Sequence, residues 1–124
     1  MDFDMALSYA KKAYRVNPNS PLVLWDYAGA LIMLKKEKKA IELLKRIQQM
    51  SDDLTMYGFT DPDTKWMQSL KNDSNFLIGE AYYTICEDIL ANEFLTNYLS
   101  NRTKSMKSIF TKKKALSYLK EINK

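Results

Sequence analysis

The chain has 124 residues, of which 46% are hydrophobic and 27% are charged, and its net charge is +4. This length suits one domain with a single core, and three glycines and three prolines are too few for a turn-rich β fold or a disordered chain. Because there is no histidine and only one cysteine, Cys86, the sequence excludes a histidine base, a Cys–His dyad, a zinc site built on His and Cys, and an internal disulfide.

Apolar residues recur at spacings of three and four along most of the chain, which predicts an all-α protein. Ser20 and Pro21 are suited to cap and begin one helix. A longer helix near the middle is either continuous or bent near residues 73–75, and it follows an irregular linker. The expected helices cover residues 4–16, 21–34, 38–50, 62–86, 88–99 and 112–122.

An internal repeat relates the first helix to the third. A shift of 34 residues aligns four positions of their apolar faces, namely Ala6 with Ala40, Leu7 with Ile41, Ala10 with Leu44, and Ala13 with Ile47. Two predicted hairpins also each hold a pair of small residues twelve positions apart, Ala28 with Ala40 and Gly79 with Ala91. Small side chains let two helix axes approach while larger ones fill the surrounding space.

These features resemble the tetratricopeptide repeat family, in which each 34-residue unit is a helical hairpin with small residues at the crossing. The resemblance implies a single domain over residues 1–124, built as a short α-solenoid of antiparallel hairpins. Its parts would be a half-repeat at 4–16, a hairpin at 21–50, a linker at 51–63, a hairpin at 64–100 and a closing helix at 112–123. The chain departs from the family pattern because its two hairpins are offset by 51 residues and because Lys35 and Cys86 stand at turns that often hold glycine.

The resemblance also implies a concave groove that binds peptides or proteins. The family's groove positions correspond here to Leu22, Trp25, Gly29, Ile32 and Met33 in the first hairpin, and to Asp73, Phe76, Glu80, Tyr83 and Thr84 in the second. The family's clamp for a terminal carboxylate is not expected, because Trp25 and Gly29 occupy its Lys and Asn positions.

The predicted partner-binding residues are Trp25, Ile32, Met33, Trp66, Asp73, Phe76, Glu80 and Tyr83. A competing interpretation has Trp25, Ile32 and Met33 packing on the first helix or under the closing helix. For residues 66–73, one interpretation buries Trp66 and Leu70, and the other joins Asn72, Asp73 and Arg102 in a polar recognition site.

Charge is distributed unevenly along the chain. Residues 1–50 carry nine basic and five acidic side chains, residues 51–100 carry two and nine, and residues 101–124 carry eight and one. The basic end is most simply a solvated helix face, although nucleic-acid binding through Lys104, Lys107, Lys112, Lys113 and Lys114 is a second alternative function. The acidic middle raises the first alternative, an immunity-type protein that neutralises a toxin with a basic surface.

No catalytic, metal or cofactor motif is recognisable in the sequence. The acids near residues 52–63 lack the glycine and closing glutamate of a calcium loop, and no phosphate-binding loop or nucleophile motif occurs. The chain shows no secretion-signal pattern, and its longest apolar stretch, residues 27–34, is far shorter than a membrane span. We therefore expect a cytoplasmic, non-enzymatic protein that binds a protein or peptide, with no metal, cofactor or membrane partner.

Overall fold

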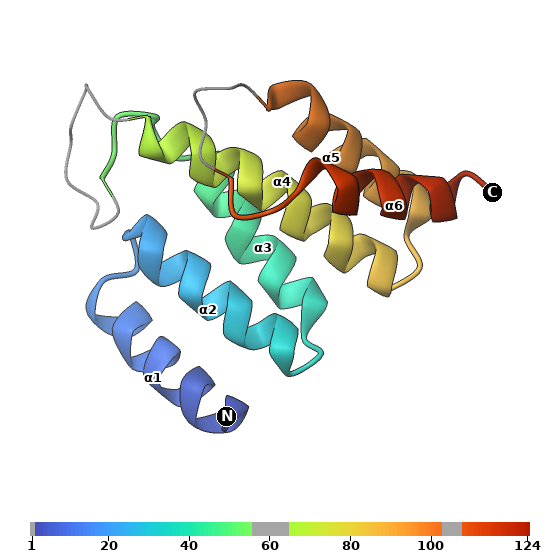
Figure 1. Ribbon diagram of the computed structural model, residues 1–124. Helices are drawn as coiled ribbons and strands as arrows, with labels where there is room; N and C mark the ends of the chain where they lie inside the picture. Colours follow the sequence, from blue (N-terminus) through green and yellow to red (C-terminus); the bar gives the residue numbers. More distant parts are fainter. Residues whose placement is uncertain (1, 56–64, 103–107) are drawn as a thin grey trace.

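The computed structural model describes residues 2–55, 65–102 and 108–124. These residues form six α-helices and no β-strand, and Figure 1 shows α1 to α5 in chain order across the molecule, with α6 beside α4 and α5. The helices are α1 (Phe3–Val16), α2 (Pro21–Met33), α3 (Glu37–Gln48), α4 (Trp66–Thr84), α5 (Asp88–Asn101) and α6 (Lys112–Ile122). The predicted all-α class is therefore confirmed.

The helix ends follow from local chemistry. Ser20 caps α2, since its hydroxyl oxygen accepts a hydrogen bond from the backbone N–H of Val23 at 3.4 Å, and Pro21 is the first helical residue. Helix α4 is continuous and shows no break near residues 73–75. There the hydroxyl of Ser74 donates to the carbonyl of Leu70 at 2.9 Å, so it is satisfied inside the helix. The expected start of this helix, Pro62, lies outside the described residues.

The two hairpin turns share one backbone geometry. Lys35 lies in the α2–α3 turn and Cys86 in the α4–α5 turn, and both have left-handed φ values, of 62° and 64°. In each turn the next amide donates to the carbonyl five residues earlier, at 2.8 Å in the first turn and 2.9 Å in the second. This is the hydrogen-bond pattern of a Schellman motif, which satisfies carbonyls left free at a helix end.

Small residues lie where the helices of each hairpin pack together. Ala28 and Ala40 have no exposed surface in the first hairpin, and neither has Ala91 in the second. Gly79 is a close approach, because a Cβ atom there would come within 2.7 Å of the Leu95 side chain. The paired small residues therefore occupy buried positions in both hairpins.

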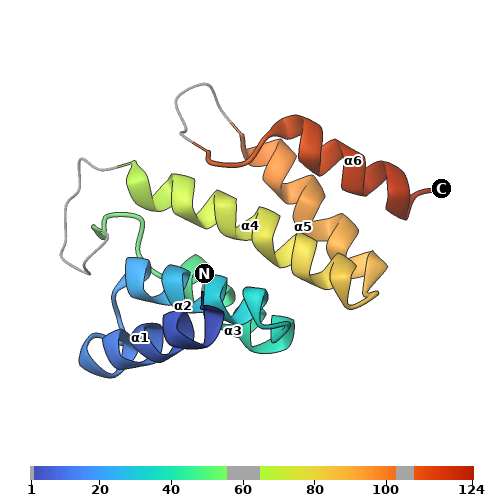
Figure 2. The same cartoon turned by 60° about the horizontal axis from the view of Figure 1, so that its bottom comes forward.

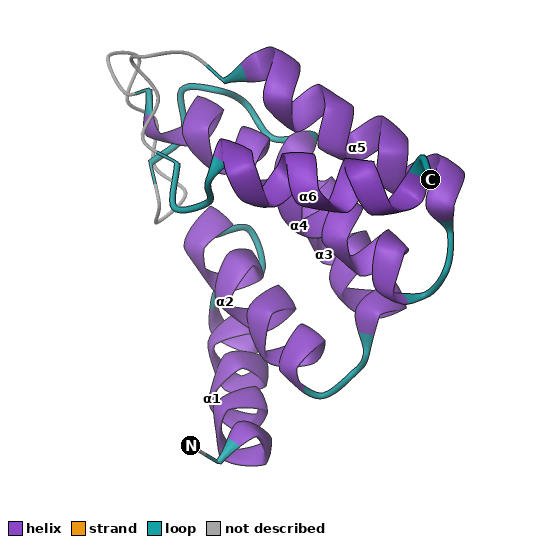
Figure 3. Ribbon diagram, turned by 45° about the vertical axis from the view of Figure 1, so that its right-hand side comes forward, coloured by secondary structure: helices purple, strands orange, loops and turns teal. Residues whose placement is uncertain are grey.

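The two hairpins meet through α3 and α4. Helix α2 packs on α1 and α3 but has no extensive contact with α4, and α6 packs on α5 and α4. Figure 2 shows α1–α3 on one side of the molecule and α4–α6 on the other, and Figure 3 shows α1 and α2 apart from α4, α5 and α6. This arrangement leaves space between α2 and α4. None of the described helices is both long and apolar enough to cross a bilayer.

Candidate functional site: a groove between two tryptophans

A groove of about 570 Å³ lies between α2 and α4. The residues that line it are Leu22, Trp25, Lys65, Trp66, Ser69, Leu70, Asp73 and Ile109. Three of them, Trp25, Trp66 and Asp73, belong to the predicted partner-binding set. The groove is accordingly built by the first helix of each hairpin, with one residue contributed by the segment before α6.

Both tryptophans of the chain line this groove. Trp25 and Trp66 are half-buried and pack against the main hydrophobic core, which fixes their positions. Trp25 also approaches Phe110, with ring centroids 6.4 Å apart. A pair of supported aromatic side chains with exposed surface offers a large apolar contact area at low entropic cost.

Asp73 lies at one end of the groove but is only 5% exposed. Its carboxylate accepts hydrogen bonds from the hydroxyl of Ser108 at 2.5 Å and from the backbone N–H of Ile109 at 3.3 Å. Burial raises the pKa of Asp73, while these two hydrogen bonds and the charge of Arg102 oppose that rise. The carboxylate therefore holds residues 108 and 109 in place, which positions Ile109 at the groove.

The polar residues proposed as a recognition site form an internal network. Arg102 donates to the Tyr98 hydroxyl at 2.6 Å and to the carbonyl of Phe110 at 2.9 Å. The side-chain amide of Asn72, which is 4% exposed, donates to the backbone carbonyl of Tyr98 at 3.0 Å. Asn72, Asp73 and Arg102 are thus brought near one another, and their bonds tie the segment before α6 to α4 and α5.

Three of the groove residues predicted in the second hairpin, Phe76, Glu80 and Tyr83, contact α6 or the segment before it. Phe76 has no exposed surface and stacks on Phe110 with centroids 4.3 Å apart, so its expected accessibility is wrong. The Tyr118 hydroxyl donates to the Glu80 carboxylate at 2.6 Å, and the Tyr118 ring lies 5.0 Å from the Tyr83 ring. The physical reason is that the closing helix covers the surface that these side chains would otherwise present.

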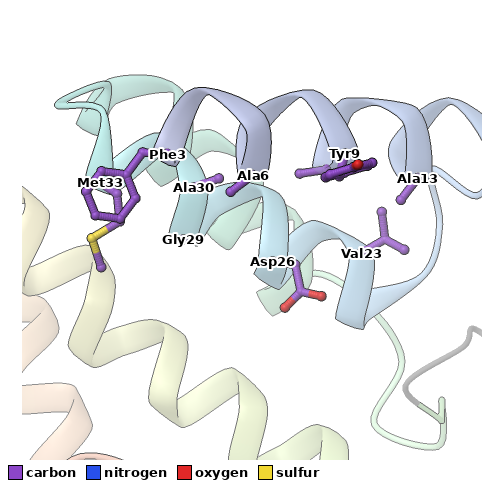
Figure 4. Close-up of a pocket in the computed structure, with 10 residues that line it drawn as sticks. Phe3, Ala6, Tyr9, Ala13, Val23, Asp26, Gly29, Ala30 and Met33 are labelled. Atoms are coloured by element: carbon purple, nitrogen blue, oxygen red, sulfur yellow. The ribbon is translucent and has the colours of Figure 1, made fainter. Parts of the chain in front are cut away.

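The remaining predicted residues, Ile32 and Met33, lie away from this groove. Ile32 is partly buried against the main core. Met33 is 56% exposed and lines a different groove, between α1 and α2 (Figure 4). Met33 therefore lies beside the first helix and outside the shared groove, but more than half of its surface is exposed, so it is not packed on that helix.

Five lining residues were not in the predicted partner-binding set: Leu22, Lys65, Ser69, Leu70 and Ile109. Of these, Leu22 had been named only as a groove position of the family. Leu70 follows Trp66 by one helical turn, a spacing that places both side chains on one face. The sequence gives a weaker indication that Ile109 packs against the rest of the protein, because it forms an apolar pair with Phe110 within a polar stretch. Its contribution depends on tertiary contacts with Asp73, which no local pattern reveals.

Residues 2–54, which comprise α1, α2 and α3, match the family model of the tetratricopeptide repeat. This match supports a tetratricopeptide-like repeat in the first three helices. No curated protein and no solved structure gives a significant match to it. Outside the matched residues, the tetratricopeptide-like character of α4 and α5 depends on the shared turn geometry and buried small residues described above. Tetratricopeptide repeats generally mediate contacts between proteins and are not catalysts.

Proposed function

We propose that this tetratricopeptide-like protein binds an apolar segment of a partner protein in the groove between α2 and α4. The observation that carries the proposal is the pair of half-buried tryptophans, Trp25 and Trp66, on either side of an open groove of about 570 Å³. Helices anchored in the core hold both side chains, so little conformational entropy is lost when a partner binds. The protein acts as a non-catalytic interaction module.

The chemistry of the groove indicates what the bound segment contains. Leu22 and Leu70 extend the apolar walls around the tryptophans, and burial of apolar surface contributes about 25 cal/mol per Å². Lys65 supplies a cation at the rim, where an acidic side chain of the partner would pair with it. The carboxylate of Asp73 is already satisfied by Ser108 and Ile109. We therefore expect a segment with one or two large apolar side chains beside an acidic residue.

Intrinsic fluorescence tests this proposal directly, because both tryptophans of the chain line the groove. Peptides selected against the full chain from a random display library should shift or quench tryptophan emission on titration. Trp25→Ala should weaken the same peptides by about tenfold or more, which corresponds to about 1.4 kcal/mol. Ile89→Ala is the matched control, since Ile89 is 87% exposed and lies on α5.

Two results would contradict the proposal. Selected peptides that bind without any change in tryptophan emission would occupy another surface. Equal affinity for the Trp25→Ala variant and the native chain would have the same meaning, provided that the variant retains its helical circular dichroism.

Binding of nucleic acid and neutralisation of a toxin stay hypotheses. Lys112 and Lys113 are exposed on α6, while Lys114 lies 3.5 Å from Glu80, and the other two lysines of this hypothesis lie outside the described residues. Nucleic-acid affinity would fall steeply with salt, whereas binding in the apolar groove would change little. For the toxin hypothesis, Asp52 is already paired with Lys71 at 2.5 Å, which reduces the free acidic surface.

A further inference from the structure

A second groove, of about 470 Å³, lies between α1 and α2 (Figure 4). Phe3, Tyr9 and Met33 line it and are 39%, 63% and 56% exposed. Gly29 contributes to its floor, and a Cβ atom built at Gly29 meets no atom within 4 Å. The groove is therefore an open apolar surface that begins at the first helix of the stack.

The internal repeat shows what covers the same surface elsewhere in the chain. The α3 positions related to α1 by the 34-residue shift, including Ala40, Leu44 and Ile47, have no exposed surface, and α2 packs on α3. The corresponding α1 residues line the groove: Ala6 and Ala10 are only half-buried and Ala13 is exposed. Helix α1 thus has an uncovered face whose counterpart on α3 is covered by a helix.

The second hairpin repeats this relationship. Helix α4 packs on α5, and the α5 residues Ala91, Leu95 and Tyr98 have no exposed surface. In both hairpins the covering element is a helix with a small residue at the crossing, Ala28 in α2 and Gly79 in α4. The shape that fits the face of α1 is therefore an α-helix with a small residue near its centre.

The charge in the groove specifies the occupant further. Asp26 lines the groove from α2, with its carboxylate pointing away from α1 (Figure 4), and it forms no hydrogen bond or ion pair with any residue that the structure describes. Burial raises the pKa of this carboxyl group, which reflects its partly apolar surroundings. A basic side chain placed here would pair with this carboxylate.

We propose that the groove between α1 and α2 binds an amphipathic helix of another protein, with a small residue facing Ala6 and a basic residue facing Asp26. The bound helix would pack on α1 in the same way that α2 packs on α3. This surface is separate from the tryptophan groove, and one partner could use either surface without the other.

A synthetic peptide based on α2 is the probe. It has the sequence of residues 20–36 with Trp25 replaced by lysine, and it carries a fluorescein label. Trp25 is chosen because it lies on the face of α2 that points to the next hairpin, where it lines a groove with α4 residues. In the docked peptide, the lysine at the position of Trp25 would therefore point to α2 and Asp26 of the protein. Two control peptides have glutamate in place of that lysine or a shuffled order without helical periodicity.

Fluorescence anisotropy with the full chain should show saturable binding of the lysine peptide and about tenfold weaker binding of the glutamate peptide. Gly29→Phe should abolish binding by filling the groove, and the open space at Gly29 allows this variant to fold. Asp26→Lys should reverse the preference between the lysine and glutamate peptides. Circular dichroism establishes that both variants are folded.

Several results would overturn the proposal. These are no binding of the lysine peptide, equal binding of the shuffled peptide, or binding that survives Gly29→Phe. A dimer in sedimentation velocity that Gly29→Phe dissociates would also overturn it, because a second copy of the chain would then fill the groove. Trp66→Ala should leave affinity for the helical peptide unchanged, so this test and that of the tryptophan groove can fail separately.

Discussion

Lys35 and Cys86 lie 51 residues apart and adopt the same left-handed backbone conformation, with φ of 62° and 64°. Each lies two residues beyond the end of the first helix of a hairpin, where the chain turns into the second helix. A side chain in this conformation brings its Cβ close to the backbone, which costs roughly 1–2 kcal/mol. The two hairpin turns therefore retain the geometry that glycine favours although neither contains glycine.

Lys35→Gly should stabilise the protein. Relief of the left-handed strain exceeds the greater unfolded-state entropy of glycine, so we expect a gain of about 0.5–1 kcal/mol in the free energy of unfolding by urea denaturation. Lys36→Gly is the matched control, because Lys36 has a φ of −107° and the substitution there brings only the entropic cost. A loss of stability in Lys35→Gly would contradict the strain argument.

Alanine should act in opposite directions at the two helical glycines. At Gly29 a Cβ atom meets open space, so Gly29→Ala should stabilise α2 by about 0.5–1 kcal/mol through helix propensity. At Gly79 the Cβ atom would come within 2.7 Å of the buried Leu95 side chain, and overpacking of about 1–3 kcal/mol should exceed the same propensity gain. Thermal unfolding of both variants measures the difference, and melting temperatures that shift in the same direction would be the contrary result.

Removal of the Phe76 side chain should destabilise the protein more than removal of the Trp25 side chain. Phe76→Ala should lower the free energy of unfolding by about 3–5 kcal/mol, since the side chain is fully buried against Phe110 and Tyr98. Trp25→Ala should cost clearly less stability, because Trp25 is only half-buried. Denaturant titrations measure both values. If Phe76→Ala unfolds at the same denaturant concentration as the native chain, the placement of α6 over Phe76 is wrong.

Asp26→Asn should stabilise the protein at neutral pH. Burial raises the pKa of Asp26 above its ordinary value of 3.8, so the native state binds a proton more tightly than the unfolded state does. Stability therefore falls as the pH rises through the native-state pKa and the carboxyl group ionises. The advantage of Asp26→Asn should be present at pH 7 and vanish below pH 3.8, as urea denaturation at each pH would show. An advantage of equal size at both pH values would contradict this assignment.

The predicted helices correspond closely to those observed because their signals are local. Ser20 and Pro21 mark the start of α2 by their own chemistry, and the apolar rows predict faces that bury as expected. The twelve-residue pairing of small residues likewise predicts hairpins, since a close helix crossing requires a small side chain at a fixed distance along the chain. Helix caps, apolar rows and small-residue spacing can therefore be recognised without knowing which segment packs against them.

The candidate site was predicted less completely. Trp25 and Trp66 were expected to bind a partner and do line one groove, but their function there stays a prediction. Phe76 matched the family's groove position equally well, yet α6 and Phe110 cover it. Nothing near Phe76 in the sequence distinguishes an aromatic residue that faces a groove from one beneath a closing helix.

The sequence by itself determined the helices, their hairpin pairing and the absence of histidine and disulfide chemistry, because composition, caps and apolar periodicity act over a few residues. The tertiary structure decided which faces stay open. Three placements depend on contacts between segments that are distant in the sequence. Helix α6 lies over Phe76, residues 108 and 109 lie against Asp73, and α2 lies away from α4. Such contacts set the burial of each side chain, and burial is what separates a binding residue from a core residue.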